Sequence, residues 1–143
     1  MKCISILVVF FIAACATISE SGVLYNTFSA YSFEANSKNI GSISSKYFSA
    51  DLLRNKNIQN SEISSQLLFK DYMTVTYSHL EKISGNGGCL TVNGFDDEKM
   101  PLAFNIEYIK SSERWLIKSI DILFLEDKSE FSSKPKCPYE YIN

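Results

Sequence analysis

The residues that could carry acid–base or metal chemistry are few and widely spaced in this chain. It has 143 residues and a single histidine, His79, which we expect at the surface or capping a helix end. Asp96, Asp97 and Glu98 are contiguous, whereas calcium loops space their carboxylates at alternate positions, so we predict a solvated loop. The glycine-rich run at 85–88 lacks the Lys-Ser/Thr of a phosphate-binding loop. We therefore expect no catalytic triad, no metal site and no cofactor.

The first 14 residues are typical of a secretory signal peptide. Lys2 supplies a positive charge, and residues 4–14 form an uncharged apolar stretch that is too short to span a membrane as a helix. The stretch ends in Ile12-Ala13-Ala14-Cys15, in which an aliphatic residue and two small residues precede a cysteine. This motif resembles the lipobox of bacterial lipoproteins. The alternative is an ordinary cleaved signal, in which the two alanines precede the cut and Cys15 is incidental.

The lipobox resemblance implies a membrane-anchored mature protein that begins at Cys15. The thiol would carry diacylglycerol and the new amino group would be acylated; each buried CH₂ of such chains contributes about 0.8 kcal/mol of membrane binding. Residues 15–22 would form a lipidated tether, and residues 23–143 a single folded domain. The residue after the cysteine is Ala16 rather than Asp. By the same resemblance, this implies transport of the lipoprotein to the outer membrane, where the domain faces the periplasm.

Two cysteines remain in the folded domain, Cys89 and Cys137, because Cys3 leaves with the signal peptide and Cys15 is lipidated. An even pair in an oxidising compartment favours a disulfide, which would close a loop of 49 residues counting both cysteines. The alternatives are two free buried thiols or a metal pair. One histidine without close spacing argues against zinc.

The overall composition indicates a folded domain that does not bind nucleic acid. The hydrophobic fraction is 45% and the aromatic fraction 13%, which is far too apolar for a solvated coil. Lys and Arg number 14 against 16 Asp and Glu, and no basic run is present.

Helical patterns dominate the first half of the domain. Apolar residues recur at helical spacing in two segments separated by a polar break at 36–39. They are Leu24, Phe28, Tyr31 and Ala35, followed by Ile40, Ile43, Tyr47 and Phe48. Ser49 is predicted to cap a short turn that buries Leu52 and Leu53. Residues 61–83 predict a long helix, which either breaks near Tyr72 or includes a β-favouring strand around residues 74–77.

Strand patterns follow. Residues 89–92 predict a short strand that runs into a turn at Asn93-Gly94. Residues 102–109 alternate with the period of a half-buried strand, and residues 110–113 predict a hairpin turn. Residues 114–125 are apolar on both faces, so we expect that strand to lie inside a sheet, with material packed on each side. Helices followed by antiparallel strands predict an α+β fold.

Two stretches are similar to segments of small bacterial envelope proteins of the NTF2-like superfamily. Residues 43–53 resemble the second-helix segment, with Phe48-Ser49 followed by Leu52-Leu53, and residues 114–122 resemble a late strand with Trp115 and Asp121. The resemblance implies N-terminal helices packed on a curved antiparallel sheet, the NTF2-like cone. Three clear strands are fewer than the family usually has, so the cone is incomplete unless residues 73–77 or the tail supply another.

The resemblance also implies a candidate pocket. In NTF2-like enzymes the cone can hold a carboxylate base with tyrosine donors, and a desolvated carboxyl group has a raised pKa. Asp121 is the matching carboxylate, since strict alternation places it on one strand face with Trp115. Tyr72, Tyr77 and Tyr108 are the candidate pocket walls.

Each of these pocket residues has a structural alternative. Asp121 would otherwise lie at a strand edge or pair with Lys118 or Arg114, and the tyrosines would form aromatic core. We therefore expect a lipid-anchored envelope protein whose domain is a non-enzymatic protein-binding module, of the assembly-factor or toxin-immunity type. The alternative is a small-ligand pocket or an isomerase- or dehydratase-like enzyme of the same superfamily.

Overall fold

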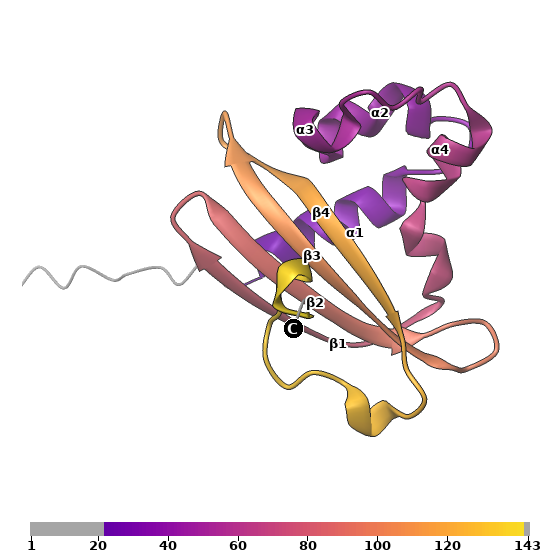
Figure 1. Cartoon of the computed structure of the whole chain (residues 1–143), viewed down its shortest axis with the longest axis vertical. Helices are drawn as coiled ribbons and strands as arrows, with labels where there is room; N and C mark the ends of the chain where they lie inside the picture. The colour runs from indigo at the N-terminus through magenta and orange to yellow at the C-terminus, as the bar shows by residue number, and fades with distance from the viewer. Residues whose placement is uncertain (1–21, 142–143) are drawn as a thin grey trace, which may run out of the picture.

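The structure, a computed structural model, describes residues 22–141 and has an α+β architecture, which confirms the predicted class. Helices come first, a four-stranded antiparallel sheet follows, and the chain ends in a tail with two 3₁₀ turns, η2 (Lys128–Glu130) and η3 (Pro138–Tyr141). Figure 1 shows the first helix behind a curved open sheet, the shorter helices beyond one edge of the sheet, and the yellow tail in front of it. We call these two faces of the sheet the helix side and the tail side.

Helix α1 (Val23–Glu34) forms where the apolar spacing predicts it and buries Leu24, Phe28 and Tyr31. The Glu81 carboxylate accepts hydrogen bonds from the backbone amides of Gly22 and Tyr25 at 2.6 and 3.0 Å. A negative charge is favourable at the amino end of a helix, where amides lack partners of their own. This contact holds the start of α1 against the sheet.

Three short helices and a 3₁₀ turn complete the helix side. They are α2 (Ile40–Tyr47), α3 (Ala50–Leu53), α4 (Ser61–Gln66) and η1 (Phe69–Tyr72). The predicted cap at Ser49 is confirmed, because its side chain accepts a hydrogen bond from the Leu52 amide at 3.3 Å. The Asn60 side chain caps α4 in the same way. These caps set where α3 and α4 begin.

The sheet is a meander in the order β1-β2-β3-β4. Its strands are β1 (Val75–Ser84), β2 (Gly87–Phe95), β3 (Pro101–Ser111) and β4 (Arg114–Phe124). The predicted hairpin between the last two strands turns at Ser112 and Glu113, whose φ angles of 47° and 65° are both positive. Two successive positive φ angles match the twist of a two-residue hairpin.

The long helix predicted over residues 61–83 is replaced by three elements. Helix α4 ends at Gln66, η1 follows, and β1 begins at Val75. The alternative expectation of a strand near residues 74–77 is therefore the one that holds, and the strand extends to Ser84. Pairing with β2 decides the outcome, because apolar spacing alone fits both helix and strand here. This segment supplies the fourth strand.

The turn predicted at Asn93-Gly94 is wrong, because both residues lie inside β2 and pair with β1 and β3. A Cβ built on Gly94 would lie 2.3 Å from the Val75 carbonyl oxygen, so the glycine permits a close backbone approach. The turn comes later, where the Asp96 carboxylate accepts hydrogen bonds from the amides of Glu98 and Met100 at 3.0 and 2.8 Å.

Strand β4 is covered on both sides, as its two apolar faces predicted, but the expectation that it lies inside the sheet is wrong, because it is an edge strand. Helices α2 and α3 contact it on the helix side, and η3 of the tail contacts it on the other. A parallel bridge from Phe48 to Ile117 adds a contact at its outer edge. No helix in residues 22–141 is long and apolar enough to cross a membrane.

Candidate functional site

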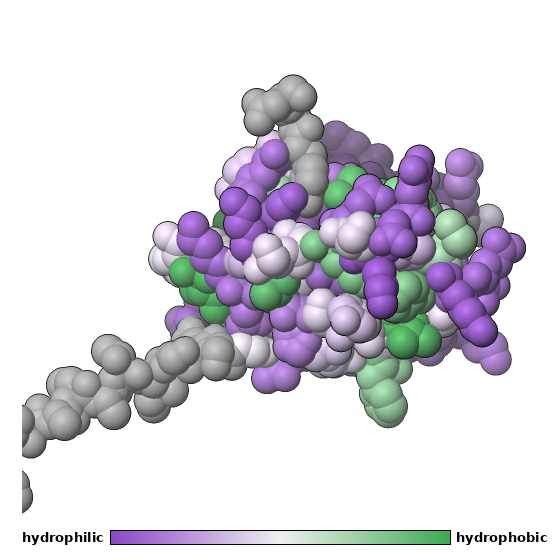
Figure 2. All heavy atoms as spheres, turned by 90° about the horizontal axis from the view of Figure 1, so that it is seen from below, coloured by the Kyte–Doolittle hydropathy of each residue, from purple (hydrophilic) through white to green (hydrophobic). Residues whose placement is uncertain are grey.

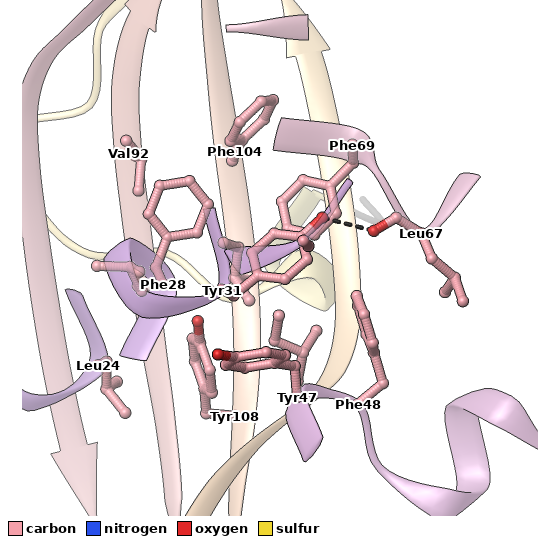
Figure 3. Close-up of a cluster of buried hydrophobic side chains, with 14 of the residues drawn as sticks. Leu24, Phe28, Tyr31, Tyr47, Phe48, Leu67, Phe69, Val92, Phe104 and Tyr108 are labelled. Carbon is pink, nitrogen blue, oxygen red and sulfur yellow. Dashed lines mark hydrogen bonds between the residues drawn. The ribbon is translucent and has the colours of Figure 1, made fainter. Parts of the chain in front are cut away.

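Aromatic rings fill the space between α1 and the sheet, where a cone-shaped pocket would lie (Figure 3). The Tyr31 ring stacks on Phe69 with centroids 5.3 Å apart, and Phe69 meets Phe104 edge-on at 5.2 Å. The Tyr31 hydroxyl donates a hydrogen bond to the Leu67 carbonyl oxygen, and burial raises the pKa of that phenol. These rings form core and leave the helix side packed with side chains.

Tyr108 and Trp115, two of the five candidate pocket residues, belong to this buried side. Burial raises the pKa of the Tyr108 hydroxyl well above its usual range, and that hydroxyl has no hydrogen-bond partner among residues 22–141. The Lys110 ammonium lies 6.0 Å above the Trp115 ring, within the range of a cation–π contact. Both aromatic side chains therefore pack as core.

Asp121 lies on the opposite side of the sheet. The ladder between β3 and β4 pairs Tyr108 with Ile117 but Glu107 with Ser119, so Lys118 is an extra residue at a β-bulge. One extra residue reverses the alternation beyond it. Asp121 then pairs with Asn105 on the tail side, which corrects the expectation that it shares a face with Trp115.

Tyr72 and Tyr77 lie near the surface in two different clusters. Tyr72, which is 52% exposed, meets Phe124 edge-on at 6.0 Å. Tyr77, which is 63% exposed, packs near Phe131 of the tail at 5.4 Å. The five candidate residues thus occupy the core, the tail side and two surface clusters, and the expected pocket is not assembled by the described residues.

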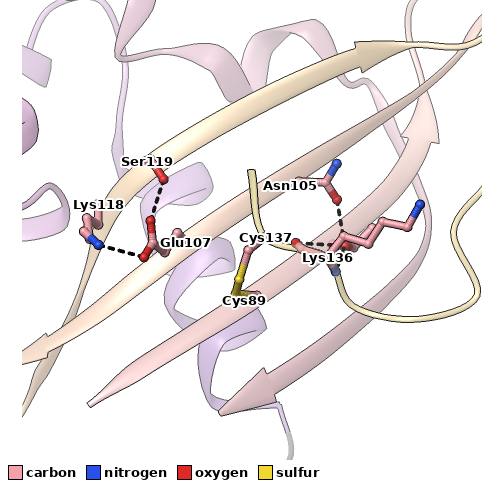
Figure 4. Close-up of a disulfide and its surroundings, with 8 residues drawn as sticks. Cys89, Asn105, Glu107, Lys118, Ser119, Lys136 and Cys137 are labelled. Carbon is pink, nitrogen blue, oxygen red and sulfur yellow. Dashed lines mark hydrogen bonds and ion pairs between the residues drawn. A yellow bond between two sulfur atoms is a disulfide. The ribbon is translucent and has the colours of Figure 1, made fainter. Parts of the chain in front are cut away.

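Cys89 and Cys137 form the predicted disulfide, with their Cα atoms 5.1 Å apart (Figure 4). The bond joins β2 to the tail just before η3. Nearby, Glu107 accepts hydrogen bonds from Lys118 and Ser119, both at 2.8 Å, and the bond to Glu107 raises the pKa of Lys118. Lys118 therefore pairs with Glu107 rather than with Asp121.

Polar side chains line the tail side beside the disulfide. The Thr91 hydroxyl donates to the Asn105 side-chain oxygen at 2.8 Å and accepts from the Lys136 amide at 2.8 Å. The Asn93 side chain donates to the Ser78 hydroxyl at 3.0 Å and to the Ser132 carbonyl at 3.1 Å. These bonds attach the tail to the middle of the sheet.

His79 lies in β1 and stacks flat on the Tyr25 ring, with centroids 3.6 Å apart. It is at the surface, as expected, but in a strand rather than at a helix end. The acidic run at 96–98 forms the loop between β2 and β3, where Asp96 serves as an acceptor for backbone amides. Residues 22–141 contain no group of three or more side chains arranged to hold a metal ion.

The surface is hollowed by grooves rather than by one deep cavity. A groove of about 420 Å³ runs between α1, η1 and the start of β1, and an open groove of about 650 Å³ lies between α1, the end of α2 and the β3–β4 turn. Phe33 borders the larger groove and is 95% exposed. Figure 2 shows the molecule from below the view of Figure 1, and on that face small hydrophobic patches lie among mainly hydrophilic side chains.

Phe33 is not among the residues that the sequence predicts for a site, although the sequence contains a signal for it. It falls outside the stripe formed by Leu24, Phe28, Tyr31 and Ala35. A large apolar residue on the outer face of an amphipathic helix is directed at solvent.

Cys15, the proposed lipid attachment site, lies outside the described residues.

Comparison of the chain with protein-family models, with curated proteins and with solved structures found no match.

Proposed function

We propose that this chain is a bacterial envelope lipoprotein whose lipid on Cys15 anchors a protein-binding α+β domain. The observation that carries the proposal is the motif Ile12-Ala13-Ala14-Cys15 at the end of an uncharged apolar stretch that follows Lys2. The disulfide between Cys89 and Cys137 supports it, because such bonds persist in oxidising compartments like the bacterial envelope.

The anchor would hold the domain close to the membrane. The first helix begins at Val23, so residues 15–22 are the whole connection between lipid and domain. An extended chain spans at most about 3.3–3.6 Å per residue, which gives a reach of about 25–30 Å. Ala16 after the cysteine favours the outer membrane, with the domain facing the periplasm.

We further propose that the domain is a variant of the NTF2-like cone. Helices on one side of a curved four-stranded antiparallel sheet support this proposal. The order of elements and the positions of the two similar stretches support it as well. Residues 43–53 span the end of α2 and all of α3, and residues 114–122 lie in β4.

Binding of a protein partner suits this domain better than binding of a small molecule inside the cone. Aromatic side chains occupy the helix side, and Asp121 is on the tail side, away from Tyr108 and Trp115. A filled interior directs recognition to the surface, where the exposed Phe33 borders an open groove.

The anchor is tested by mass spectrometry of the mature amino terminus and by incorporation of labelled palmitate. We expect a triacylated or diacylated peptide beginning at Cys15, and loss of label in Cys15→Ser with Cys3→Ser as the matched control. An unmodified amino terminus at Ala16, or a soluble unacylated form, would contradict the anchor.

The binding role is tested by purification from native membranes with the anchor retained. We expect a protein to co-purify in fixed proportion. Recovery of a bound small molecule with no protein would instead favour the ligand-pocket or isomerase-like alternative.

A further inference from the structure

The chain contains two Asn-Gly pairs, Asn86-Gly87 and Asn93-Gly94, and the fold places them in different surroundings. An asparagine followed by glycine is especially prone to spontaneous deamidation, because glycine has no Cβ to hinder attack by its own main-chain nitrogen on the asparagine side chain. The reaction needs a backbone that can bring this nitrogen onto the side-chain carbon Cγ. Exposure and local opening therefore decide whether an Asn-Gly pair reacts.

Asn86-Gly87 lies at the tip of the hairpin between β1 and β2. Gly85 and Asn86 form its turn, and Ser84 pairs with Gly87 across it. The φ angle of Gly85 is 59°, as expected for the first central residue of a type II′ turn. Asn86 is exposed, and a Cβ built on Gly87 would meet only the Ser84 carbonyl oxygen, at 3.7 Å. A hairpin tip opens locally at a low free-energy cost, so this pair has room to react.

Asn93-Gly94 lies inside β2 and is enclosed. Asn93 is fully buried, and its side-chain amide donates hydrogen bonds to the Ser78 hydroxyl and the Ser132 carbonyl oxygen. A Cβ on Gly94 would lie 2.3 Å from the Val75 carbonyl oxygen, so neighbouring backbone fills the space around this glycine. Both residues of the pair are matched with residues of β1 and of β3. Reaction here requires the sheet to open, which costs far more free energy than opening a hairpin tip.

We propose that Asn86 is a site of spontaneous deamidation in the folded protein, and that the fold protects Asn93 from the same reaction. The Gly87 main-chain nitrogen attacks Cγ of Asn86, the bond from Cγ to Nδ2 breaks, and Nδ2 leaves as ammonia with the Gly87 amide proton. Water then opens the cyclic succinimide. Cleavage at Cγ gives aspartate, and cleavage at the main-chain carbonyl carbon gives isoaspartate. The reaction consumes one water and releases one ammonia, and it needs no other reactant.

The products change the charge and the length of this hairpin. Both add one negative charge, and isoaspartate also adds a methylene to the main chain between β1 and β2. The Asn86 carbonyl oxygen accepts a hydrogen bond from the Lys110 amide at 2.7 Å, and in isoaspartate that oxygen belongs to the new carboxylate. A charged acceptor strengthens such a bond, so the modified turn can keep its link to β3. This modification goes beyond the proposed function and does not depend on it.

The first test compares the folded and the unfolded full chain at slightly alkaline pH, where the attacking amide loses its proton more readily. Incubation in water enriched in heavy oxygen marks each new carboxyl group, and peptide mapping by mass spectrometry locates it. In the folded chain we expect labelling at Asn86 at least about tenfold faster than at Asn93, which corresponds to about 1.4 kcal/mol of opening free energy. In denaturant, with the disulfide reduced, both should react at similar rates. Equal rates in the folded chain, or a folded chain unlabelled at Asn86, would overturn the proposal.

The second test uses Gly87→Ala to hinder the attacking nitrogen. Gly87 is outside the left-handed region and the added Cβ makes an ordinary contact, so we expect the fold to be retained, which circular dichroism checks. Labelling at Asn86 should fall several-fold in the folded and in the unfolded chain. Asn86→Gln keeps an amide but disfavours ring closure, and should abolish both the label and isoaspartate at this position. An unchanged rate in Gly87→Ala, with aspartate as the sole product of the unaltered chain, would indicate direct hydrolysis and overturn the proposal.

Discussion

The two sides of the sheet are closed by different forces. On the helix side, rings from four separate segments interlock, and residues such as Phe104 and Ile106 are fully buried. On the tail side, Thr91, Asn93 and Asn105 are buried as well, yet they are polar. There a tail without long helices or strands is held by hydrogen bonds, by one disulfide and by the Phe131 ring, which meets Tyr77 and Phe95.

The difference teaches how a small domain can cover both faces of one sheet. Apolar rings gain free energy by leaving water, so the helix side needs no covalent link. A polar face gains little from burial and each group must find a partner. Asn93 and Asn105 keep one side-chain atom each without a partner among residues 22–141. The disulfide therefore carries a larger share of closure on the tail side.

The largest expected effect is on the helix side. Phe104→Ala removes a fully buried ring that meets Phe28 and Phe69 edge-on. Large-to-small changes of this kind cost about 3–5 kcal/mol of unfolding free energy. Denaturant titration measures it, with the exposed Phe124→Ala as the control, for which we expect a change within about 0.5 kcal/mol. A loss below about 1 kcal/mol in the first variant would contradict a tightly packed helix side.

The disulfide comes next. The double variant Cys89→Ala, Cys137→Ala frees the tail, and we expect a loss of about 2–4 kcal/mol of unfolding free energy, since the bond closes a long loop. Hydrogen exchange should increase first at tail-side contacts such as the Lys136 amide, while amides of α1 stay protected. Equal loss of protection on both sides would break the distinction between them.

Much of the helix side could be predicted from the sequence because its signals are local. The stripe of Leu24, Phe28 and Tyr31 required only helical spacing, and the Ser49 cap required only its neighbours. Phe33 was predictable as exposed for the same reason. The disulfide followed from the number of cysteines and the expected compartment.

The errors fall where a contact between distant segments overrides a local pattern. Strict alternation places Asp121 on the same strand face as Trp115, but the bulge at Lys118 moves Asp121 to the opposite face of the sheet. No feature of residues 114–122 alone indicates this bulge. Gly94 resembles a turn residue, whereas its role is to let Val75 approach. The inserted residue separates Asp121 from Tyr108 and Trp115. Tyr72 and Tyr77 are apart for another reason, because they lie exposed in η1 and β1.

A smaller effect tests the polar contacts of the tail side. Thr91→Val keeps the shape of the side chain but removes the hydroxyl that bonds Asn105 and Lys136. Loss of such buried partners costs about 1–3 kcal/mol. Thr91→Ser retains the hydroxyl and should recover most of that loss, apart from one methyl group. If valine and serine give the same stability, the polar row contributes nothing to holding the tail.

The smallest effect compares acid sensitivity on the two sides. On the helix side, a hydrogen bond from Lys46 and a smaller contribution from Tyr47 lower the pKa of Glu34, the last residue of α1. In the tail, a hydrogen bond from the Ser129 amide lowers the pKa of Asp127. A lowered folded-state pKa stabilises the fold above the unfolded value, about 4.3 for Glu and 3.9 for Asp, and that stabilisation disappears as the pH falls through the folded value.

Salt separates these two carboxylates. Glu34 is paired with a charged ammonium at the surface, so high salt should move its pKa back toward 4.3, whereas Asp127 accepts from a neutral amide and should respond less. Carboxyl-carbon NMR titrations at low and high ionic strength measure both values in one sample. Lys46→Met should reproduce the salt effect on Glu34 and leave Asp127 unchanged. Equal salt responses would mean that the charge of Lys128, rather than the Ser129 amide, sets the pKa of Asp127.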